Sequence, residues 1–193
     1  MNLPNQLSIS RLVLTVPFVA LCYSGLPNAQ SWALLVFGIA SLTDMLDGQI
    51  ARSRGLVTNF GKLFDPLADK ILMAAALTML AIERDIPAWI VIAIMGREFF
   101  VTGIRQIAVS QGVVLAAERL GKHKMIWQVV TVIYFLAKLA SKEPMLAFIA
   151  PVFQWKLMSP EVFGRFTIYL TAALTLISGF SYFWKNRRLF SDA

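Results

Sequence analysis

Six apolar segments, each close to the length of a helix that crosses a membrane, constrain the fold of this chain more than any other feature. A helix needs about 20 mainly apolar residues to span the hydrocarbon core of a bilayer. The six segments cover residues 7–26, 32–51, 60–82, 87–109, 125–140 and 162–184; the fifth is short and the third carries charges. They predict an all-α fold, a polytopic membrane helix bundle with six transmembrane helices, in a single domain over residues 1–193.

The composition indicates that lipid covers much of this apolar surface. Hydrophobic residues make up 58% of the chain and charged residues 15%, whereas a soluble domain is about 45–50% apolar and about 25% charged. One soluble core of this size cannot bury so much apolar surface, so a soluble globular domain and a disordered chain are both excluded. Cys22 is the only cysteine, which excludes a disulfide scaffold and favours a buried packing role for this residue.

The basic residues predict the orientation of the bundle. The formal net charge is +7, and most Lys and Arg flank the apolar segments on one side, while the turns at 26–31 and 83–86 hold few. The positive-inside rule then places both termini in the cytoplasm. Contact with anionic lipid headgroups accounts for the basic excess without a nucleic-acid partner. Residues 144–158, which contain Pro151, are expected to form a re-entrant or interfacial piece and not a span.

Four aspartates stand where a membrane helix is normally apolar. Asp44 and Asp47 are three residues apart near the end of the second segment, and Asp65 and Asp69 are four apart near the start of the third. Each pair therefore shares one side of its helix, although a charge at mid-membrane costs about 2.5–3.5 kcal/mol on insertion scales. The connection around residues 52–60 is short, so the two helices are antiparallel neighbours. All four carboxylates are expected to converge on one cavity at the cytoplasmic end.

Converging carboxylates repel one another unless positive charge lies between them. Their hard oxygen ligands suit Mg²⁺, Mn²⁺ or Ca²⁺, and two divalent ions balance four negative charges. Ion pairs with Lys62 and Lys70 are the structural alternative. Small residues between the aspartates let the helices, or a ligand, approach closely: Gly48, Ala51 and Gly61. Together with Arg52, this pattern describes a metal cavity with room for a flat or phosphorylated ligand.

The stretch from Asp44 to Asp69 reads D-x2-D-G-x2-A-R-x8-G-x3-D-x3-D. Every fixed position matches the signature of the CDP-alcohol phosphatidyltransferase family, and the chain resembles this family over its whole length. The resemblance implies a six-helix membrane bundle that transfers a phosphatidyl group from CDP-diacylglycerol to an alcohol and releases CMP. It also implies a homodimer, a location in the bacterial cytoplasmic membrane and an active site that faces the cytoplasm.

The same resemblance implies roles for single residues. Asp44, Asp47, Asp65 and Asp69 would hold two Mg²⁺ (or Mn²⁺) ions, and Asp69 would also act as the general base. The residues expected to bind CDP-diacylglycerol are Gly48, Ala51, Arg52, Thr58, Gly61, Asn5, Ser8 and Arg11. For the last three, an interfacial helix with ordinary caps is the open alternative. The motif holds no Ser, Cys or His suited to a covalent intermediate, so a single direct displacement is expected.

Basic residues in the second half of the chain are the candidates for binding the acceptor phosphate: Arg97, Arg105, Lys122 and Lys124. They would form a phosphate pocket beside the metal ions. Their segments resemble those of family members that use sn-glycerol 3-phosphate, which implies that acceptor. Arg97 and Glu98 are sequence neighbours that point in different directions, so each is expected to have another partner. A positive-inside role alone is the alternative for Lys124.

Two further functions stay open at the level of sequence. Within the family, the acceptor would instead be serine, inositol phosphate or phosphatidylglycerol; a dianionic acceptor needs several fixed cations, and their presence favours a phosphorylated one. Outside the family, a divalent-cation channel or carrier would line its path with the carboxylates. The four aspartates lie at one end, however, and Glu83 and Asp85 are the only acids expected near the other. This distribution favours the enzyme.

Overall fold

The computed structural model describes residues 3–54, 59–113, 115 and 119–187, with side chains at 9–43, 70–113, 115 and 120–187. This described part is helical and contains no strand, which confirms the all-α prediction. Its long helices are α1 (Leu3–Tyr23), α2 (Ala29–Arg54), α3 (Asn59–Ile82), α4 (Ala88–Ser110), α5 (Arg119–Ala140) and α7 (Arg165–Asn186). Shorter pieces join α5 to α7: η1 (Pro144–Ile149), α6 (Ala150–Gln154), η2 (Lys156–Met158) and η3 (Pro160–Gly164). Each expected apolar segment overlaps one long helix.

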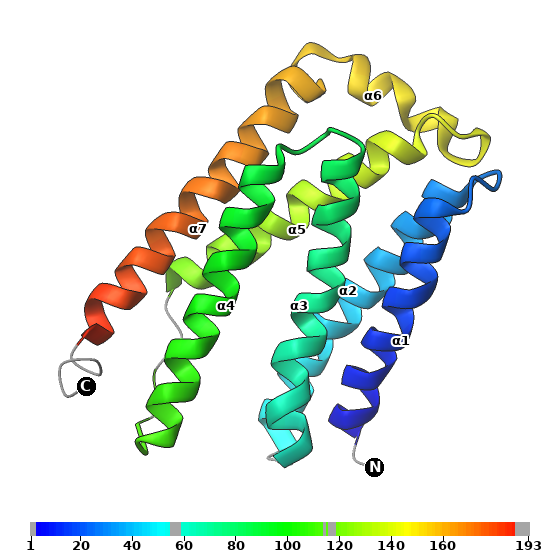
Figure 1. Cartoon of the computed structure of the whole chain (residues 1–193). Helices are drawn as coiled ribbons and strands as arrows, with labels where there is room; N and C mark the ends of the chain where they lie inside the picture. The colour runs from blue at the N-terminus through cyan, green and yellow to red at the C-terminus, as the bar shows by residue number, and fades with distance from the viewer. Residues whose placement is uncertain (1–2, 55–58, 114, 116–118, 188–193) are drawn as a thin grey trace.

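The long helices run between two ends of the bundle (Figure 1). At one end, which we call the terminal end, α1 and α3 begin and α2, α4 and α7 end. The α1–α2 turn, the α3–α4 turn and the short pieces between α5 and α7 lie at the other end, the turn end. α1 packs against α2 and α3, while α7 packs against α4 and α5. The terminal end therefore holds the end of α2 and the start of α3, the two segments that carry the aspartates.

The length and composition of the described helices identify one or two membrane spans. The stretch Lys156–Asn186 is long and apolar enough to cross a membrane. A second span results if Leu120–Ala140 and Pro144–Gln154, which are bent by 115° at their junction, are taken together. The described apolar stretches of α1, α2 and α3 are shorter, and charged residues interrupt α4. The six predicted spans thus stay a prediction.

The distribution of polar and apolar side chains is typical of a bundle surrounded by lipid. Val16, Ile92 and Phe180 are 70%, 71% and 67% exposed, whereas Thr167 and Thr175 are fully buried. Helices in lipid associate through close packing and interhelical hydrogen bonds, so hydroxyl groups gather inside and apolar groups outside. A core of large apolar side chains from α1 to α5 fills the centre, and Cys22 is partly buried against it, as predicted.

The segment between α5 and α7 presents apolar side chains outward. None of the residues of η1, α6 and η2 is buried, and Phe148, Trp155 and Leu157 are among the most exposed large side chains of the described chain. Trp residues and amphipathic helices are typical of the boundary between headgroups and acyl chains. Of the two alternatives for residues 144–158, the exposed apolar groups favour the interfacial one.

Glu143 joins the end of α5 to the start of α2 at the turn end, so the expectation that Glu83 and Asp85 are the only acids near this end is wrong. Its carboxylate accepts hydrogen bonds from the backbone N–H groups of Gln30 (2.9 Å) and Ser31 (2.8 Å) and from the Ser31 hydroxyl (2.7 Å). The first N–H groups of a helix have no partner within it, and the positive end of the helix dipole favours an anion. Glu143 therefore caps a helix that lies more than a hundred residues earlier in the chain.

We expect Glu143→Ala to lower the free energy of unfolding by about 1–3 kcal/mol, because it leaves part-buried donors of α2 without this acceptor. Unfolding in detergent by denaturant or heat measures this loss. The matched control is the exposed neighbour Lys142, whose replacement by Ala should change stability by no more than about 0.5 kcal/mol. Equal stability of the two variants would contradict the capping role.

Candidate functional site

The four aspartates lie on two helices that meet at the terminal end. Asp44 and Asp47 belong to the last turns of α2, and Asp65 and Asp69 to the first turns of α3. Their side chains lie outside the described ones, so the convergence of the carboxylates stays a prediction. Among the described side chains, no group of three or more His, Cys, Asp or Glu is placed to hold a metal. A donor set made of carboxylates alone fits Mg²⁺ or Mn²⁺ and not a soft, thiolate-preferring metal.

Most of the residues expected to bind CDP-diacylglycerol also have side chains outside the described ones. The side chains of Asn5, Ser8, Gly48, Ala51, Arg52 and Gly61 lie outside the described ones, and Thr58 lies outside the described residues altogether. Arg11 is the exception, because its side chain is described and only 6% exposed. It lines a cavity of about 30 Å³ between α1, α2, α3 and α5, together with Ser41, Leu72, Met125 and other mainly apolar residues.

The described side chains of α3 begin at Lys70, directly after Asp69, and here α3 contacts α4. The Lys70 ammonium donates a hydrogen bond to the Thr102 hydroxyl, which in turn donates to the backbone carbonyl of Glu98 (2.8 Å). Asp69 is therefore followed in the chain by a residue that contacts a polar face of α4. On that face Glu98, Thr102 and Arg105 follow one another at spacings of four and three residues, which keeps them on one side of the helix.

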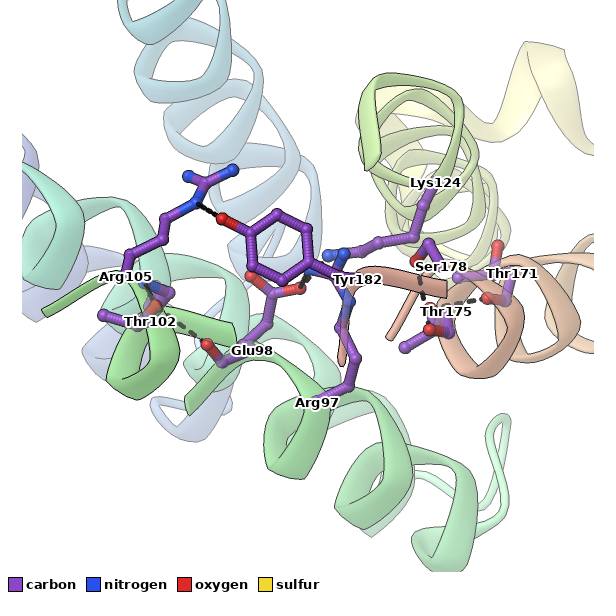
Figure 2. A network of polar contacts seen from close by, with 10 residues as sticks. Arg97, Glu98, Thr102, Arg105, Lys124, Thr171, Thr175, Ser178 and Tyr182 are labelled. Atoms are coloured by element: carbon purple, nitrogen blue, oxygen red, sulfur yellow. Dashed lines mark hydrogen bonds and ion pairs between the residues drawn. The ribbon is translucent and has the colours of Figure 1, made fainter. Parts of the chain in front are cut away.

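Glu98 is the centre of an ion-pair network between α4 and α5 (Figure 2). Its carboxylate accepts from the Lys124 ammonium and from a terminal nitrogen of Arg97, Nη1, at 3.2 Å. The side chains are little exposed, 5% for Lys124, 12% for Arg97 and 17% for Glu98. We call Lys70, Arg97, Glu98, Thr102 and Lys124 the polar cluster. It brings basic side chains of α3, α4 and α5 to one place, and basic side chains suit an anionic ligand.

The positions of Arg97 and Glu98 differ in part from the sequence-based expectation. Glu98 does have another partner, Lys124, but the Arg97 side chain also turns back to its neighbour. Gly179 of α7 explains this path, because a Cβ atom at Gly179 would lie only 2.8 Å from Cγ of Arg97. Arg97 thus crosses α7 where no side chain stands in its way. Its Nε atom is buried and has no hydrogen-bond partner within the described part of the chain.

Arg105 lies at the exposed edge of the same face of α4. Its Nε donates to the hydroxyl of Tyr182 on α7 at 3.1 Å, and its guanidinium carbon lies 5.4 Å from the centre of the Tyr182 ring. Figure 2 shows both terminal nitrogens of Arg105 pointing away from that hydroxyl. Lys122, the remaining candidate, is exposed on the first turns of α5.

The structure thus brings Arg97 and Lys124 together around Glu98, while Arg105 extends the same face of α4. Sequence reasoning missed Tyr182 and gave Glu98, Thr102 and Lys70 no role in the acceptor site. The spacing of Glu98, Thr102 and Arg105 along one helix face was a signal for two of these residues. No signal of this kind exists for Tyr182, which is 77 residues from its partner.

Comparison with known proteins gives consistent results. Residues 1–177 match the family model described as CDP-alcohol phosphatidyltransferase. The chain is similar to CDP-diacylglycerol–glycerol-3-phosphate 3-phosphatidyltransferase of Bacillus subtilis (strain 168), with 37% identity over 96% of this chain and 95% of that one. The protein of the same name from Rickettsia typhi is 34% identical over 94% of this chain and 95% of its own length. The one from Treponema pallidum is 31% identical over 94% and 88%.

Proposed function

Because this chain belongs to the CDP-alcohol phosphatidyltransferase family, we propose that it transfers the phosphatidyl group of CDP-diacylglycerol to sn-glycerol 3-phosphate. The products are phosphatidylglycerophosphate and CMP. The observation that carries the choice of acceptor is the polar cluster, which joins cations of α4 and α5 to the turn of α3 that follows Asp69. The names of the relatives point to the same acceptor. Purified protein given CDP-diacylglycerol, Mg²⁺ and each candidate acceptor should form lipid product with glycerol 3-phosphate.

The carboxylates of α2 and α3 supply the groups that such a transfer needs. When bound, two Mg²⁺ or Mn²⁺ ions held by Asp44, Asp47, Asp65 and Asp69 would neutralise the diphosphate and the departing CMP. Asp69 would take the proton of the acceptor hydroxyl. As it does so, the hydroxyl oxygen forms a bond to the phosphatidyl phosphorus, and the bond between that phosphorus and CMP breaks. Gly48 and Arg52 would contact the CDP part from the same turns of α2.

The polar cluster would receive the phosphate of the acceptor. The phosphate of glycerol 3-phosphate is mainly a dianion near neutral pH, and Arg97, Lys124 and Arg105 offer it basic side chains on neighbouring parts of α4 and α5. Arg105, at the exposed edge, would meet a soluble acceptor first and steer it inward. Serine carries no phosphate and would make no phosphate contact with these basic side chains. Inositol phosphate would satisfy them, so a direct comparison of the two phosphorylated acceptors belongs in the assay.

We also propose how the bundle sits in its membrane. Six spans with both termini on the cytoplasmic side would place the terminal end, and with it the site, in reach of soluble glycerol 3-phosphate. The positive-inside pattern of the sequence supports this orientation. The common end at which α1 begins and α7 ends supports two termini on the same side. A homodimer in the bacterial cytoplasmic membrane, expected from the family, stays a prediction.

Arg105→Ala should raise the KM for glycerol 3-phosphate by about 10–100-fold, because a charge-assisted contact to phosphate is lost. The KM for CDP-diacylglycerol should stay nearly unchanged. Arg105→Lys should restore little of the lost affinity for glycerol 3-phosphate, since an ammonium cannot make the paired contacts of a guanidinium. Initial rates at varied concentrations of each substrate measure both constants.

The matched control for this prediction is Arg187, an exposed arginine at the end of α7. Its guanidinium also lies over an aromatic ring, that of Trp184, at 4.5 Å, and it also makes one hydrogen bond, to the Trp184 carbonyl. Arg187→Ala should leave both KM values unchanged. An unaltered acceptor KM in Arg105→Ala, or an equal rise in Arg187→Ala, would count against the pocket.

A further inference from the structure

The last turns of α7 hold both arginines of α4 that belong to the proposed acceptor site. Tyr182 is only 3% exposed and packs against Val101 and Ile104 of α4. Its hydroxyl accepts the hydrogen bond from Nε of Arg105 at 3.1 Å, and its ring lies beside the guanidinium. A buried, packed ring provides a fixed point, so the exposed arginine is held at its Nε and not only at its backbone (Figure 2).

This contact determines which nitrogens of Arg105 remain for a ligand. A guanidinium can bind a phosphate through two nitrogens at once, either the two terminal ones or Nε with one terminal nitrogen. Tyr182 occupies Nε and leaves the two terminal nitrogens, which point away from the tyrosine hydroxyl (Figure 2). An arginine fixed in this way loses less conformational freedom when the acceptor binds.

Gly179 contacts Arg97 one turn earlier on the same buried face of α7 and leaves room for its side chain. Any side chain there would place its Cβ 2.8 Å from Cγ of Arg97. Because Cγ is close to the backbone of Arg97, the arginine cannot avoid the clash by moving only its tip. The glycine therefore permits the path along which Arg97 reaches Glu98, the carboxylate that also holds Lys124.

Both residues lie after residue 177, where the match to the family model ends. We propose that Gly179 and Tyr182 are positioning residues that hold Arg97 and Arg105 for the acceptor phosphate, so that α7 helps to set the acceptor preference of this chain. This inference rests on the proposed function, because it assumes a phosphorylated acceptor. Neither residue needs to touch the substrate in order to act.

Tyr182→Phe removes the hydroxyl and keeps the ring, and it tests the first contact. We expect the KM for glycerol 3-phosphate to rise by about 3–10-fold, the cost of one hydrogen bond, while kcat and the KM for CDP-diacylglycerol change little. Tyr134→Phe is the matched control, since the Tyr134 hydroxyl also donates one hydrogen bond, to the Met158 carbonyl, near the turn end. It should leave all three constants unchanged.

Gly179→Ala tests the second contact with an independent change. Displacement of Arg97 should raise the KM for glycerol 3-phosphate by about 10-fold, because small misplacements of a binding group are costly. Gly38→Ala is the control, since a Cβ atom at Gly38 of α2 would meet nothing within 4 Å. Elution of each variant as wild type on size exclusion in detergent confirms that it is folded.

A double-mutant cycle separates positioning from a general structural effect. If Tyr182 acts through Arg105, Tyr182→Phe should add almost nothing to the KM of Arg105→Ala. The inference is overturned if Tyr182→Phe leaves the acceptor KM unchanged, if it raises both KM values alike, or if its effect persists in full without Arg105. Failure of the proposed function looks different: the wild-type protein would form no lipid from glycerol 3-phosphate, and the inference would fall with it.

Discussion

Asp69→Asn is expected to lower kcat by about 10²–10⁴-fold while the binding of CDP-diacylglycerol largely survives. The amide has nearly the size of the carboxylate but cannot accept the proton of the acceptor hydroxyl. The place of Asp69 in the fold fits the role of a general base, because the next residue, Lys70, contacts Thr102 of α4 within the polar cluster. A base at this turn of α3 would stand between the metal-binding aspartates and the acceptor. Turnover in detergent micelles, with separate binding of CDP-diacylglycerol, measures the effect.

The control for Asp69 is another aspartate in the same fold. Asp85 lies in the turn between α3 and α4 at the turn end, where it pairs with Lys138, so Asp85→Asn should keep the turnover of the folded protein. Because Asp69 is also a predicted metal ligand, the metal content of the Asp69→Asn protein should be determined alongside its turnover. Near-normal turnover in Asp69→Asn would place the general base elsewhere.

The helices of this chain could be predicted because their apolar content is visible without tertiary contacts. Hydrophobic length marks each long helix, and the ends of α3 and α4 agree with the predicted segments to within one residue. The start of α5 does not agree: a segment from Met125 was expected, whereas the helix begins at Arg119. Most of the intervening residues are basic or polar, so a criterion of apolar length excludes them although they continue the same helix. Lys124, one of these residues, holds Glu98 from within the helix.

The site could be predicted only as far as its residues are local in sequence. The four aspartates follow from spacing along two adjacent segments, and the basic residues from their positions near helix ends. The partners of Glu98 come from two helices, however, and their meeting depends on how α4, α5 and α7 pack. The same holds for Glu143, which caps α2 across 113 residues. Long-range contacts of this kind leave no periodic signal in a single sequence.

The metal requirement follows from the charge balance at the terminal end. Two unit charges 4 Å apart interact by about 4 kcal/mol at the effective dielectric constant near a protein surface, so four converging carboxylates strongly disfavour the folded state unless cations balance them. Two divalent ions carry four positive charges, which equal the four negative charges of the carboxylates. Divalent ions therefore supply positive charge of the right size.

Exhaustive chelation of divalent metal is therefore expected to lower activity by more than about 100-fold, with recovery on addition of Mg²⁺ or Mn²⁺. A second measurement does not depend on turnover: the thermal unfolding midpoint should fall on chelation, because the carboxylates then repel one another within the fold. In Asp44→Asn/Asp65→Asn, where two charges are removed, metal should shift this midpoint much less. Undiminished activity after chelation would refute the metal site, and a midpoint that does not respond to metal would show that the four carboxylates do not converge.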